Sequence, residues 1–415
     1  MFETYNKRKI INDPVHGFIT IPDELSYDLI DHPYFQRLRR IKQLGLTSLV
    51  YPGANHSRFH HALGAMHLMM LAIDTLRMKN VQISEEDALA AYYAILLHDI
   101  GHGPFSHALE YCIIRNVNHE DLTRLLMAKM NKDFDGKLEN AITIFENQHP
   151  KKFLHQLVSG QLDVDRLDYL SRDSFFTGVS EGIIGTERII KMLNVADNQL
   201  VAEIKGIYSI EKFLISRRMM YWQVYLHKTV IAAEQLLVKI LNRAEYICRN
   251  NTPIFADDNL KLFLQNDFSV SDFQNNPDLL DAFVAIDDND IVYAIKQWTS
   301  HPDKVLSNLC KLLINRKLFK VSLQEKSFDP NYIDTLKQKL MSDYQLSETD
   351  VSYFIFSDNI SNKAYSSEGE PIKILFQDNS ITDVSEASEQ LKHLKNNQST
   401  TKYYLCHPKG LSLHF

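Results

Sequence analysis

Histidines and aspartates occur together at three places in the sequence, and these residue types bind catalytic metal ions. The stretch HDIGHGPFSH, residues 98–107, holds three histidines and one aspartate within ten positions. His61 lies upstream in HSRFHHALG, and Asp165 lies downstream in LDVDRLDYLSRD. Divalent metals that activate water take neutral imidazoles and carboxylates and keep a coordination position open. A candidate ligand set of mixed nitrogen and oxygen donors is therefore His61, His98, Asp99 and Asp165.

The alternative is that these side chains are ordinary structural residues. A single histidine beside an apolar helix face is more often a core or surface residue than a ligand, and an aspartate near a helix end is usually a cap. The chain has 17 histidines, so spacing alone leaves several accidental combinations. If a metal binds, mixed donors favour a catalytic divalent cation (iron, manganese, nickel, zinc or magnesium) over a structural zinc.

Helices are expected to position the candidate ligands. ISEEDALAAYYAILLHD begins with Ser84 at an N-cap position, has Asp87 three residues later and runs apolar to Leu97. This pattern predicts a helix with His98 and Asp99 in its last turn.

Two further stretches have helical patterns. Asp165, Tyr169 and Asp173 are spaced four apart, which places all three on one face of a helix. Residues 209–247 contain neither proline nor glycine and predict one long helix that lines the core.

The overall pattern predicts a mostly α protein with small β elements. Short strands are expected near the N-terminus in GFITI and TSLVYPG. We expect a core over residues 1–250, a helical extension over 251–345 and a small α/β appendage over 346–415. In the appendage the predicted strands are VSYFIFS, PIKILFQ and TKYYLCHP, and the predicted helix is VSEASEQLKHLKNN.

Charge and composition narrow the function classes. The chain carries 45 Lys and Arg against 52 Asp and Glu, a net charge of −7, which disfavours generic nucleic-acid or anionic-membrane binding. It lacks an apolar run long enough for a membrane span and an N-terminal signal-peptide pattern, so we expect a cytoplasmic protein. The four cysteines lie far apart and predict neither a disulfide framework nor a thiolate zinc site.

Several blocks, in order, resemble the HD-domain phosphohydrolases, in particular the deoxynucleoside triphosphate (dNTP) triphosphohydrolase branch and its vertebrate member with a SAM domain. The blocks are INDPVHGFITI, FQRLRRIKQLGLTSLVYPGANHSRFHHALG, LLHDIGHGPFSH, NHED and LDVDRLDYLSRD. The likeness spans roughly residues 9–245. It implies a helical HD-domain core, a divalent metal cofactor, hydrolysis of a dNTP to deoxynucleoside and inorganic triphosphate, and a homo-oligomer, either dimer or tetramer.

The resemblance also implies roles for individual residues. His61, His98, Asp99 and Asp165 fall on its metal-ligand positions. Its catalytic-pocket positions correspond to His102, His107, Glu110, His119 and Glu120. A histidine paired with a carboxylate can shuttle a proton near neutral pH, and the candidate pairs are His107 with Glu120 and His119 with Glu110. The alternative is that these carboxylates are supporting or surface groups.

Substrate-contacting positions of the family are occupied by Gln43, Leu44, Arg58, Arg166, Tyr169, Asp173 and Tyr225. The resemblance implies that Arg58 and Arg166 bind phosphate groups, which suit the forked guanidinium of arginine. The vertebrate relative has lysine at the position of Arg166. The resemblance implies that Tyr169 and Asp173 contact the sugar and that Asp173 accepts a hydrogen bond from the 3′-hydroxyl. The resemblance also implies a wall that rejects a 2′-hydroxyl, formed by Gln43, Leu44 and Tyr225. The alternative is that Leu44 and Tyr225 are ordinary core residues.

The sequence also departs from the vertebrate pattern. Tyr221, Trp222 and Gln223 stand where that relative has His-Arg-Arg, so two positive side chains are missing, and Arg217 and Arg218 are the candidates to replace them. Hydrolysis of another nucleotide, or nucleotide sensing without chemistry, therefore stays open. Positions that bind an activating nucleotide in the relative are matched by Lys9, Asp31, Gln36 and Arg39, which could equally form an ordinary surface.

Overall fold

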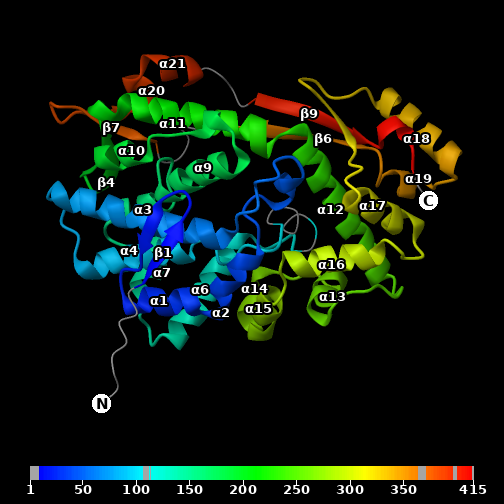
Figure 1. Cartoon of the computed structure of the whole chain (residues 1–415), viewed down its shortest axis with the longest axis horizontal. Coiled ribbons are helices and arrows are strands. Elements are labelled where there is room, and N and C mark those ends of the chain that lie inside the picture. Colours follow the sequence, from blue (N-terminus) through cyan, green and yellow to red (C-terminus); the bar gives the residue numbers. More distant parts are fainter. Residues whose placement is uncertain (1–8, 106–111, 113, 363–370, 396–399, 414–415) are drawn as a thin grey trace.

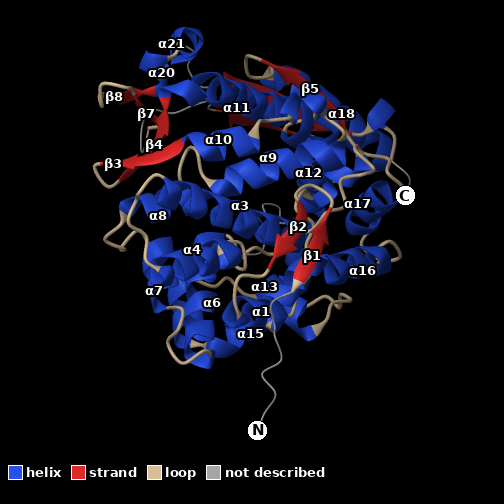
Figure 2. Cartoon of the chain, turned by 60° about the vertical axis from the view of Figure 1, so that its left-hand side comes forward, coloured by secondary structure: helices blue, strands red, loops and turns tan. Residues whose placement is uncertain are grey.

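The structure is a computed structural model that describes residues 9–105, 112, 114–362, 371–395 and 400–413. Helices dominate this part of the chain, and small sheets lie at its periphery (Figure 2). The predicted mostly α fold class is confirmed.

The N-terminal region begins with a hairpin of two antiparallel strands, β1 (Ile10–Asp13) and β2 (Gly17–Thr20). The strand predicted in GFITI is thus confirmed. α1 (Glu24–Asp31), α2 (Pro33–Gln36) and the 3-10 helix Arg37–Arg40 follow. The strand predicted in TSLVYPG is wrong, because Gly45 adopts a φ of +47° and starts a 3-10 helix, Gly45–Leu49.

Three helices form the centre of the molecule: α3 (Arg58–Met78), α4 (Glu85–Leu97) and α9 (Val164–Thr177). α3 lies between α4 and α9 and buries apolar residues around most of its circumference, as a core helix does (Figure 2). Ser84 and Asp87 form the predicted capping box of α4. The other helices beside this centre are α6 (His119–Asp133), α7 (Glu139–Phe145), α8 (Lys152–Val158) and α10 (Thr186–Met192).

The single long helix predicted over residues 209–247 is wrong. The chain forms α11 (Ile207–Met220), a π-helical turn (Tyr221–Tyr225) and α12 (Lys228–Arg249). The Leu226 amide donates to the Tyr221 carbonyl, five residues back, at 2.7 Å. His227 then leaves the helical conformation, with a ψ of 134°, and its side chain accepts from the Thr229 amide to cap α12. The break needs neither proline nor glycine.

The chain between residue 250 and β6 (Phe356–Asn362) is mostly helical and adds one strand. Its elements are α13 (Asp258–Gln265), α14 (Val270–Asn275), α15 (Pro277–Val284), α16 (Asp288–Trp298), α17 (Lys304–Ile314), β5 (Lys320–Gln324), α18 (Pro330–Tyr344) and α19 (Glu348–Val351). The strand predicted in VSYFIFS starts only at Phe356, because Ser347 caps the short helix α19 and turns precede the strand.

The C-terminal strands divide between two sheets (Figure 1). β6 (Phe356–Asn362) and β9 (Thr400–His407) join β5 in the order β5-β9-β6. β7 (Lys373–Leu375) pairs in parallel with β4 (Gln199–Glu203) in a sheet that also contains β3 (Leu193–Ala196) and β8 (Ile381–Asp383). The short helices α20 (Val384–Ala387) and α21 (Glu389–Lys395) follow β8. The α/β segment therefore packs into earlier parts of the chain.

The helices in the described part of the chain lack the combination of length and apolar character that a membrane span requires.

Candidate active site

The four candidate metal ligands converge from three helices. His61 is on α3, and Asp165 is in the first turn of α9. Contrary to the prediction, His98 and Asp99 do not lie in the last turn of α4, because that helix ends at Leu97; His98 is its C-cap residue and Asp99 follows. His61 Nε2 lies 3.1 Å from Asp165 Oδ1 and 3.4 Å from His98 Nε2. His98 Nε2 lies 3.6 Å from Asp165 Oδ1 and 3.5 Å from Asp99 Oδ1. Ligands that each sit about 2.0–2.2 Å from one cation are roughly 3–3.5 Å apart. The donor atoms of His61, His98 and Asp99 lie within 4.8 Å of one another and can hold one ion, and Asp165 lies beside both imidazoles.

Hydrogen bonds on the outer side of both imidazoles direct their Nε2 atoms toward this point. His61 Nδ1 lies 2.8 Å from Asp168 Oδ2, and His98 Nδ1 lies 2.6 Å from the Ile95 carbonyl. With Nδ1 serving as the donor, Nε2 keeps its lone pair for a metal.

Asp168 belongs to a buried network that the sequence reasoning missed. Arg172 donates to both of its carboxylate oxygens at 2.9 Å and to Asp13 at 2.7 Å. His16 Nε2 lies 2.6 Å from Asp168 Oδ1. The network joins the N-terminal hairpin to α9 and to the outer side of His61. A signal was available, because Asp168 and Arg172 are spaced i, i+4 on the helix of Asp165.

The charges at this centre compensate one another. Burial alone lowers the pKa of His61, but the hydrogen bonds that its ring donates to the carboxylates of Asp165 and Asp168 raise this pKa to about 10. Burial likewise raises the pKa of Asp165, and the two histidines more than reverse that effect. The carboxylates thus stay ionised at neutral pH, and a bound cation would take the place of the protons on the histidines.

The loop after α4 is tightly packed. The Gly101 amide donates to Thr123 Oγ1 at 3.0 Å, and the same hydroxyl donates to the His98 carbonyl at 3.0 Å. A Cβ at Gly101 would lie 2.2 Å from the His119 carbonyl oxygen, so a side chain has no room there. The loop that carries His98 and Asp99 is thereby fixed against α6.

His102 stacks on His119, with ring centroids 3.9 Å apart. Burial and the Arg58 guanidinium lower the pKa of His102 to about 3, so its ring is neutral at physiological pH. Glu120, by contrast, is exposed in the first turn of α6. His107 and Glu110 lie outside the described residues, so the pairings His107 with Glu120 and His119 with Glu110 stay predictions.

The two predicted phosphate-binding arginines are paired with aspartates. Arg58 Nη1 lies 2.5 Å from Asp99 Oδ2, beside the candidate ligands. Arg166 forms an ion pair with Asp163, the N-cap residue of α9. The Arg58 guanidinium and the neighbouring histidines hold the pKa of Asp99 well below its usual range, although burial alone would raise it. Positive charge is thus present within reach of the site.

The residues predicted for the sugar lie in one cluster. Tyr225 donates to Asp173 Oδ2 at 2.7 Å, and the Tyr169 and Tyr225 rings are 6.4 Å apart. His56, which the sequence reasoning missed, lies 2.7 Å from the other Asp173 oxygen, and its carbonyl accepts from the Gln43 amide at 3.0 Å. Leu44 is the next residue and is half-buried against the core. Tyr169 connects the cluster to the candidate ligands, since its ring centroid is 6.5 Å from that of His61.

The residues predicted to bind an activating nucleotide lie at the surface near the N-terminus. Gln36 Oε1 accepts from Arg39 Nε at 2.8 Å, and the Arg39 guanidinium lies 3.6 Å from the centre of the Phe59 ring. Lys9 donates to the Tyr27 hydroxyl at 2.9 Å, and Asp31 is exposed at the end of α1. The structure brings Gln36 and Arg39 together.

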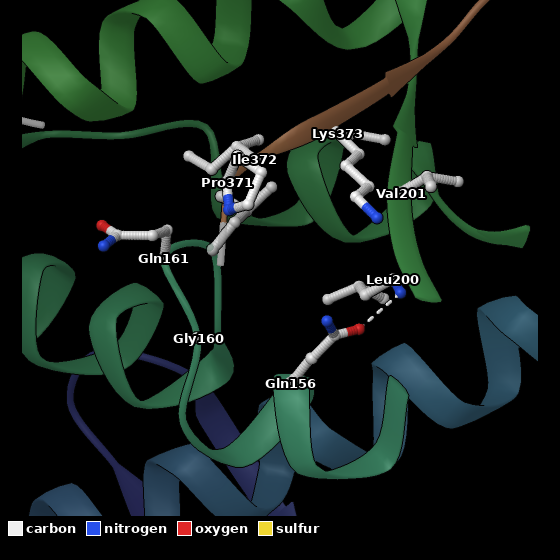
Figure 3. A pocket seen from close by; sticks show the side chains of 10 residues that line it. Gln156, Gly160, Gln161, Leu200, Val201, Pro371, Ile372 and Lys373 are labelled. Atoms are coloured by element: carbon white, nitrogen blue, oxygen red, sulfur yellow. Dashed lines mark hydrogen bonds between the residues drawn. The ribbon is translucent and has the colours of Figure 1, made fainter. Parts of the chain in front are cut away.

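A separate small pocket lies where β7 joins β4 (Figure 3). Gln156, whose side chain accepts from the Leu200 amide at 2.7 Å, lines it together with Gln161 and Lys373. Its volume of about 30 Å³ has room for only about two or three water molecules, so it is too small for a nucleotide.

Comparison with known proteins identifies the family. Residues 58–173 match the HD domain and residues 184–261 match the HD associated region. The Bacillus subtilis protein YwfO, whose name describes it as uncharacterized, is 33% identical over 420 residues, which cover 98% of this chain and 93% of that protein. The human deoxynucleoside triphosphate triphosphohydrolase SAMHD1 is 32% identical over 265 residues, which cover 53% of this chain and 42% of that enzyme.

A solved structure agrees over nearly the whole chain. A phosphohydrolase from Bacteroides thetaiotaomicron superposes with a TM-score of 0.93 at 51% sequence identity, covering 96% of this chain and 99% of that one. Together with the HD match and the convergent histidines and aspartates, this likeness assigns the chain to the HD-domain phosphohydrolases.

Proposed function

We propose that this HD-domain phosphohydrolase hydrolyses dNTPs to deoxynucleoside and inorganic triphosphate in a reaction that requires a divalent metal. The observation that carries the proposal is the approach of His61 Nε2 to within 3.1 Å of Asp165 Oδ1 and 3.4 Å of His98 Nε2. The dNTP triphosphohydrolases among the relatives support the substrate class.

The residues present fit a metal. Two imidazole nitrogens and two carboxylates form the donor set, and both imidazoles are fixed through Nδ1. We propose His61, His98, Asp99 and Asp165 as the ligands. When bound, the cation would supply Lewis-acid polarisation of the α-phosphoryl group and activation of water.

The chain's own residues perform the remaining tasks. Arg58 and Arg166 bind phosphate oxygens and offset the charge that accumulates during phosphoryl transfer. To do so they exchange their carboxylate partners, Asp99 and Asp163, for the substrate. A histidine that is hydrogen-bonded to a carboxylate protonates the departing oxygen, and the candidate pairs are His107 with Glu120 and His119 with Glu110.

The sugar cluster selects deoxyribose. Asp173 accepts a hydrogen bond from the 3′-hydroxyl, and Tyr225 and His56 hold its carboxylate in place. Gln43, Leu44 and Tyr225 form a wall at the 2′ position, where an added hydroxyl would be crowded and left without a partner, and Tyr169 contacts the sugar.

A second candidate is hydrolysis of a different nucleotide. Tyr221, Trp222 and Gln223 form most of the π-helical turn, and Lys402 Nζ lies 4.0 Å from the centre of the Trp222 ring. None of these three side chains is itself positively charged, unlike two of their counterparts in the vertebrate pattern, which favours a substrate with fewer phosphates.

The test is a substrate panel with product chromatography. Purified protein, loaded with manganese, iron, nickel, zinc or magnesium in separate samples, is incubated with dNTPs, ribonucleotides, monophosphates and cyclic nucleotides. Inorganic triphosphate appears only if the favoured reaction occurs. The double variant with His98→Ala and Asp99→Ala should lose turnover while remaining folded, and Asp74→Asn, an exposed change on α3, should keep it. Full activity in the double variant would refute the proposed site.

We also propose a homo-oligomer and an activating nucleotide. Light scattering during size-exclusion chromatography, with and without added nucleotide, tests both, and Arg39→Ala should remove the response to nucleotide. Salt-dependent mobility shifts with DNA and RNA test the rival nucleic-acid role, for which we expect no binding.

A further inference from the structure

The carboxylate of Asp288 accepts backbone hydrogen bonds from two segments that are far away in sequence. Oδ2 accepts from the Lys42 amide at 2.9 Å, and Oδ1 accepts from the Phe105 amide at 2.9 Å. Asp288 is buried, is the first residue of α16, and lies beyond both family-matched regions. A residue of the helical extension therefore contacts both sides of the candidate active site.

The hydrogen bond to Lys42 fixes a segment that pairs with the start of α3, the helix that carries His61. Lys42 forms a β-bridge with Ser57, the N-cap residue of α3. On either side of this bridge, the Arg58 amide donates to the Ile41 carbonyl at 2.9 Å and the Gln43 amide donates to the His56 carbonyl at 3.0 Å. A displacement of Lys42 would thus move the backbone of Gln43 and Arg58.

The Phe105 contact fixes the end of the loop that carries His98, Asp99 and His102. Phe105 has a φ of +51°, a conformation that a residue with a bulky side chain adopts only when its surroundings enforce it. The hydrogen bond to Asp288 is one such constraint. Phe105 also packs beside Gly45, whose ideal Cβ would lie 3.9 Å from Phe105 Cδ1.

Arg37 reinforces the same connection. Its fully buried guanidinium donates to the His102 carbonyl at 2.9 Å and to the Ile286 carbonyl at 3.1 Å. The loop of the candidate site is therefore joined to the turn before α16 through Arg37, and to α16 itself through Asp288.

The chemistry of Asp288 suits this task. An ionised carboxylate only accepts hydrogen bonds, so its two oxygens can take one amide each. Asparagine has one acceptor oxygen, and its NH₂ group would face an N–H donor. Burial raises the pKa of Asp288, and the hydrogen bonds from the Lys42 and Phe105 amides oppose that effect because they stabilise its charged form.

We propose that Asp288, assisted by Arg37, is a positioning residue that sets the loop of residues 98–105 against the segment of residues 41–43. The extension is thereby part of the catalytic unit. The expected effect on turnover rests on the function proposed above, whereas the connection between the two segments does not.

The experiment compares Asp288→Asn with Asp287→Asn in the full chain, well below the melting temperature of either variant. Asp287 is equally buried, caps α16 and pairs with Arg40, so its replacement perturbs the same helix end. Hydrogen exchange monitored by mass spectrometry follows the peptides that contain Lys42 and Phe105. Asp288→Asn should accelerate exchange of both amides at least ~10-fold, and Asp287→Asn should leave them unchanged.

Steady-state kinetics provide the second measurement. Asp288→Asn should lower kcat for the best nucleotide at least ~10-fold with KM changed less than ~3-fold, since small misplacements of catalytic groups are costly. Exchange and kcat equal to those of Asp287→Asn would overturn the proposal. If Asp288→Asn does not fold, Asp288→Glu is tested in the same way, because it keeps both acceptor oxygens but displaces them. Wild-type exchange and kcat in Asp288→Glu would also overturn the proposal.

The two proposals fail in distinguishable ways. A wild-type protein that hydrolyses no nucleotide contradicts the proposed function, and the exchange of Lys42 and Phe105 still decides the role of Asp288. A wild-type protein that releases triphosphate, with exchange and kcat insensitive to Asp288→Asn, contradicts the role of Asp288 alone.

Discussion

Asp168 Oδ2 lies 2.8 Å from His61 Nδ1, while the Nε2 of the same ring lies 3.1 Å from Asp165 Oδ1. The two aspartates are three residues apart on α9, so one helix provides both a candidate metal ligand and the acceptor that orients a second ligand. We therefore expect Asp168 to tune metal affinity without contacting the metal.

Asp168→Asn should therefore weaken binding of Mn²⁺ by about 10- to 100-fold, because a neutral amide polarises the imidazole less than a carboxylate does. Titration calorimetry on metal-free protein measures the affinity. Asp74→Asn, on the exposed side of the same helix as His61, is the control and should bind Mn²⁺ like the wild type. Equal affinities in the two variants would show that Asp168 is only structural.

Gly101→Ala should destabilise the protein by roughly 1–3 kcal/mol and also weaken Mn²⁺ binding. The added Cβ would lie 2.2 Å from the His119 carbonyl oxygen and 2.3 Å from the Thr123 amide, both backbone atoms that cannot rotate away. Gly185→Ala is the matched control, since the nearest atom to its Cβ is 4.0 Å away. Denaturant unfolding and metal titration of both variants check the prediction; an alanine at 101 that is tolerated as well as one at 185 would contradict it.

Local patterns predicted the parts of the fold that depend on neighbouring residues. The Ser84 and Asp87 capping box and the helical face of Asp165, Tyr169 and Asp173 follow from short-range spacing, and both are present. The break at His227 was not predictable in this way, because a π-helical turn and a side-chain cap replace the usual proline or glycine.

Long-range partners explain what else was missed in the candidate site. Asp168 and Arg172 carried an i, i+4 signal, but the approach of Asp13 depends on the N-terminal hairpin lying over α9. Asp288 contacts amides 246 and 183 residues away, and no local pattern marks such a contact. Residue types suggested the candidate ligands but left accidental combinations of the 17 histidines open. The resemblance selected among them because family motifs already contain that tertiary information.

Acid should remove the contribution of Asp13 to stability. Burial raises the pKa of Asp13, but the hydrogen bond and charge of Arg172 outweigh burial and lower it below its ordinary value. A carboxyl whose folded-state pKa is depressed stabilises the protein above its unfolded pKa of about 3.9, and this contribution is lost as pH falls through the folded-state pKa.

Asp13→Asn mimics the protonated carboxyl, so its deficit in unfolding free energy should be full at pH 7 and shrink below about pH 4. Urea unfolding of both proteins at pH 7, 5 and 3, in the presence of a chelator, measures this difference. A deficit that does not change with pH would mean that the charge of Asp13 contributes nothing.

The contact of Asp173 with a 3′-hydroxyl can be isolated by changing the enzyme and the substrate together. Asp173→Asn should lower kcat/KM for a dNTP by about 10- to 100-fold, the cost of losing a hydrogen bond to a charged acceptor. A 2′,3′-dideoxynucleotide has no 3′-hydroxyl to donate, so the variant and the wild type should hydrolyse it at similar rates. Tyr225→Phe keeps the carboxylate but removes the hydroxyl that holds it at 2.7 Å. It should therefore lower kcat/KM for the dNTP more weakly than Asp173→Asn and leave the dideoxynucleotide unchanged. If Asp173→Asn slows both substrates by the same factor, Asp173 shapes the pocket without recognising the sugar.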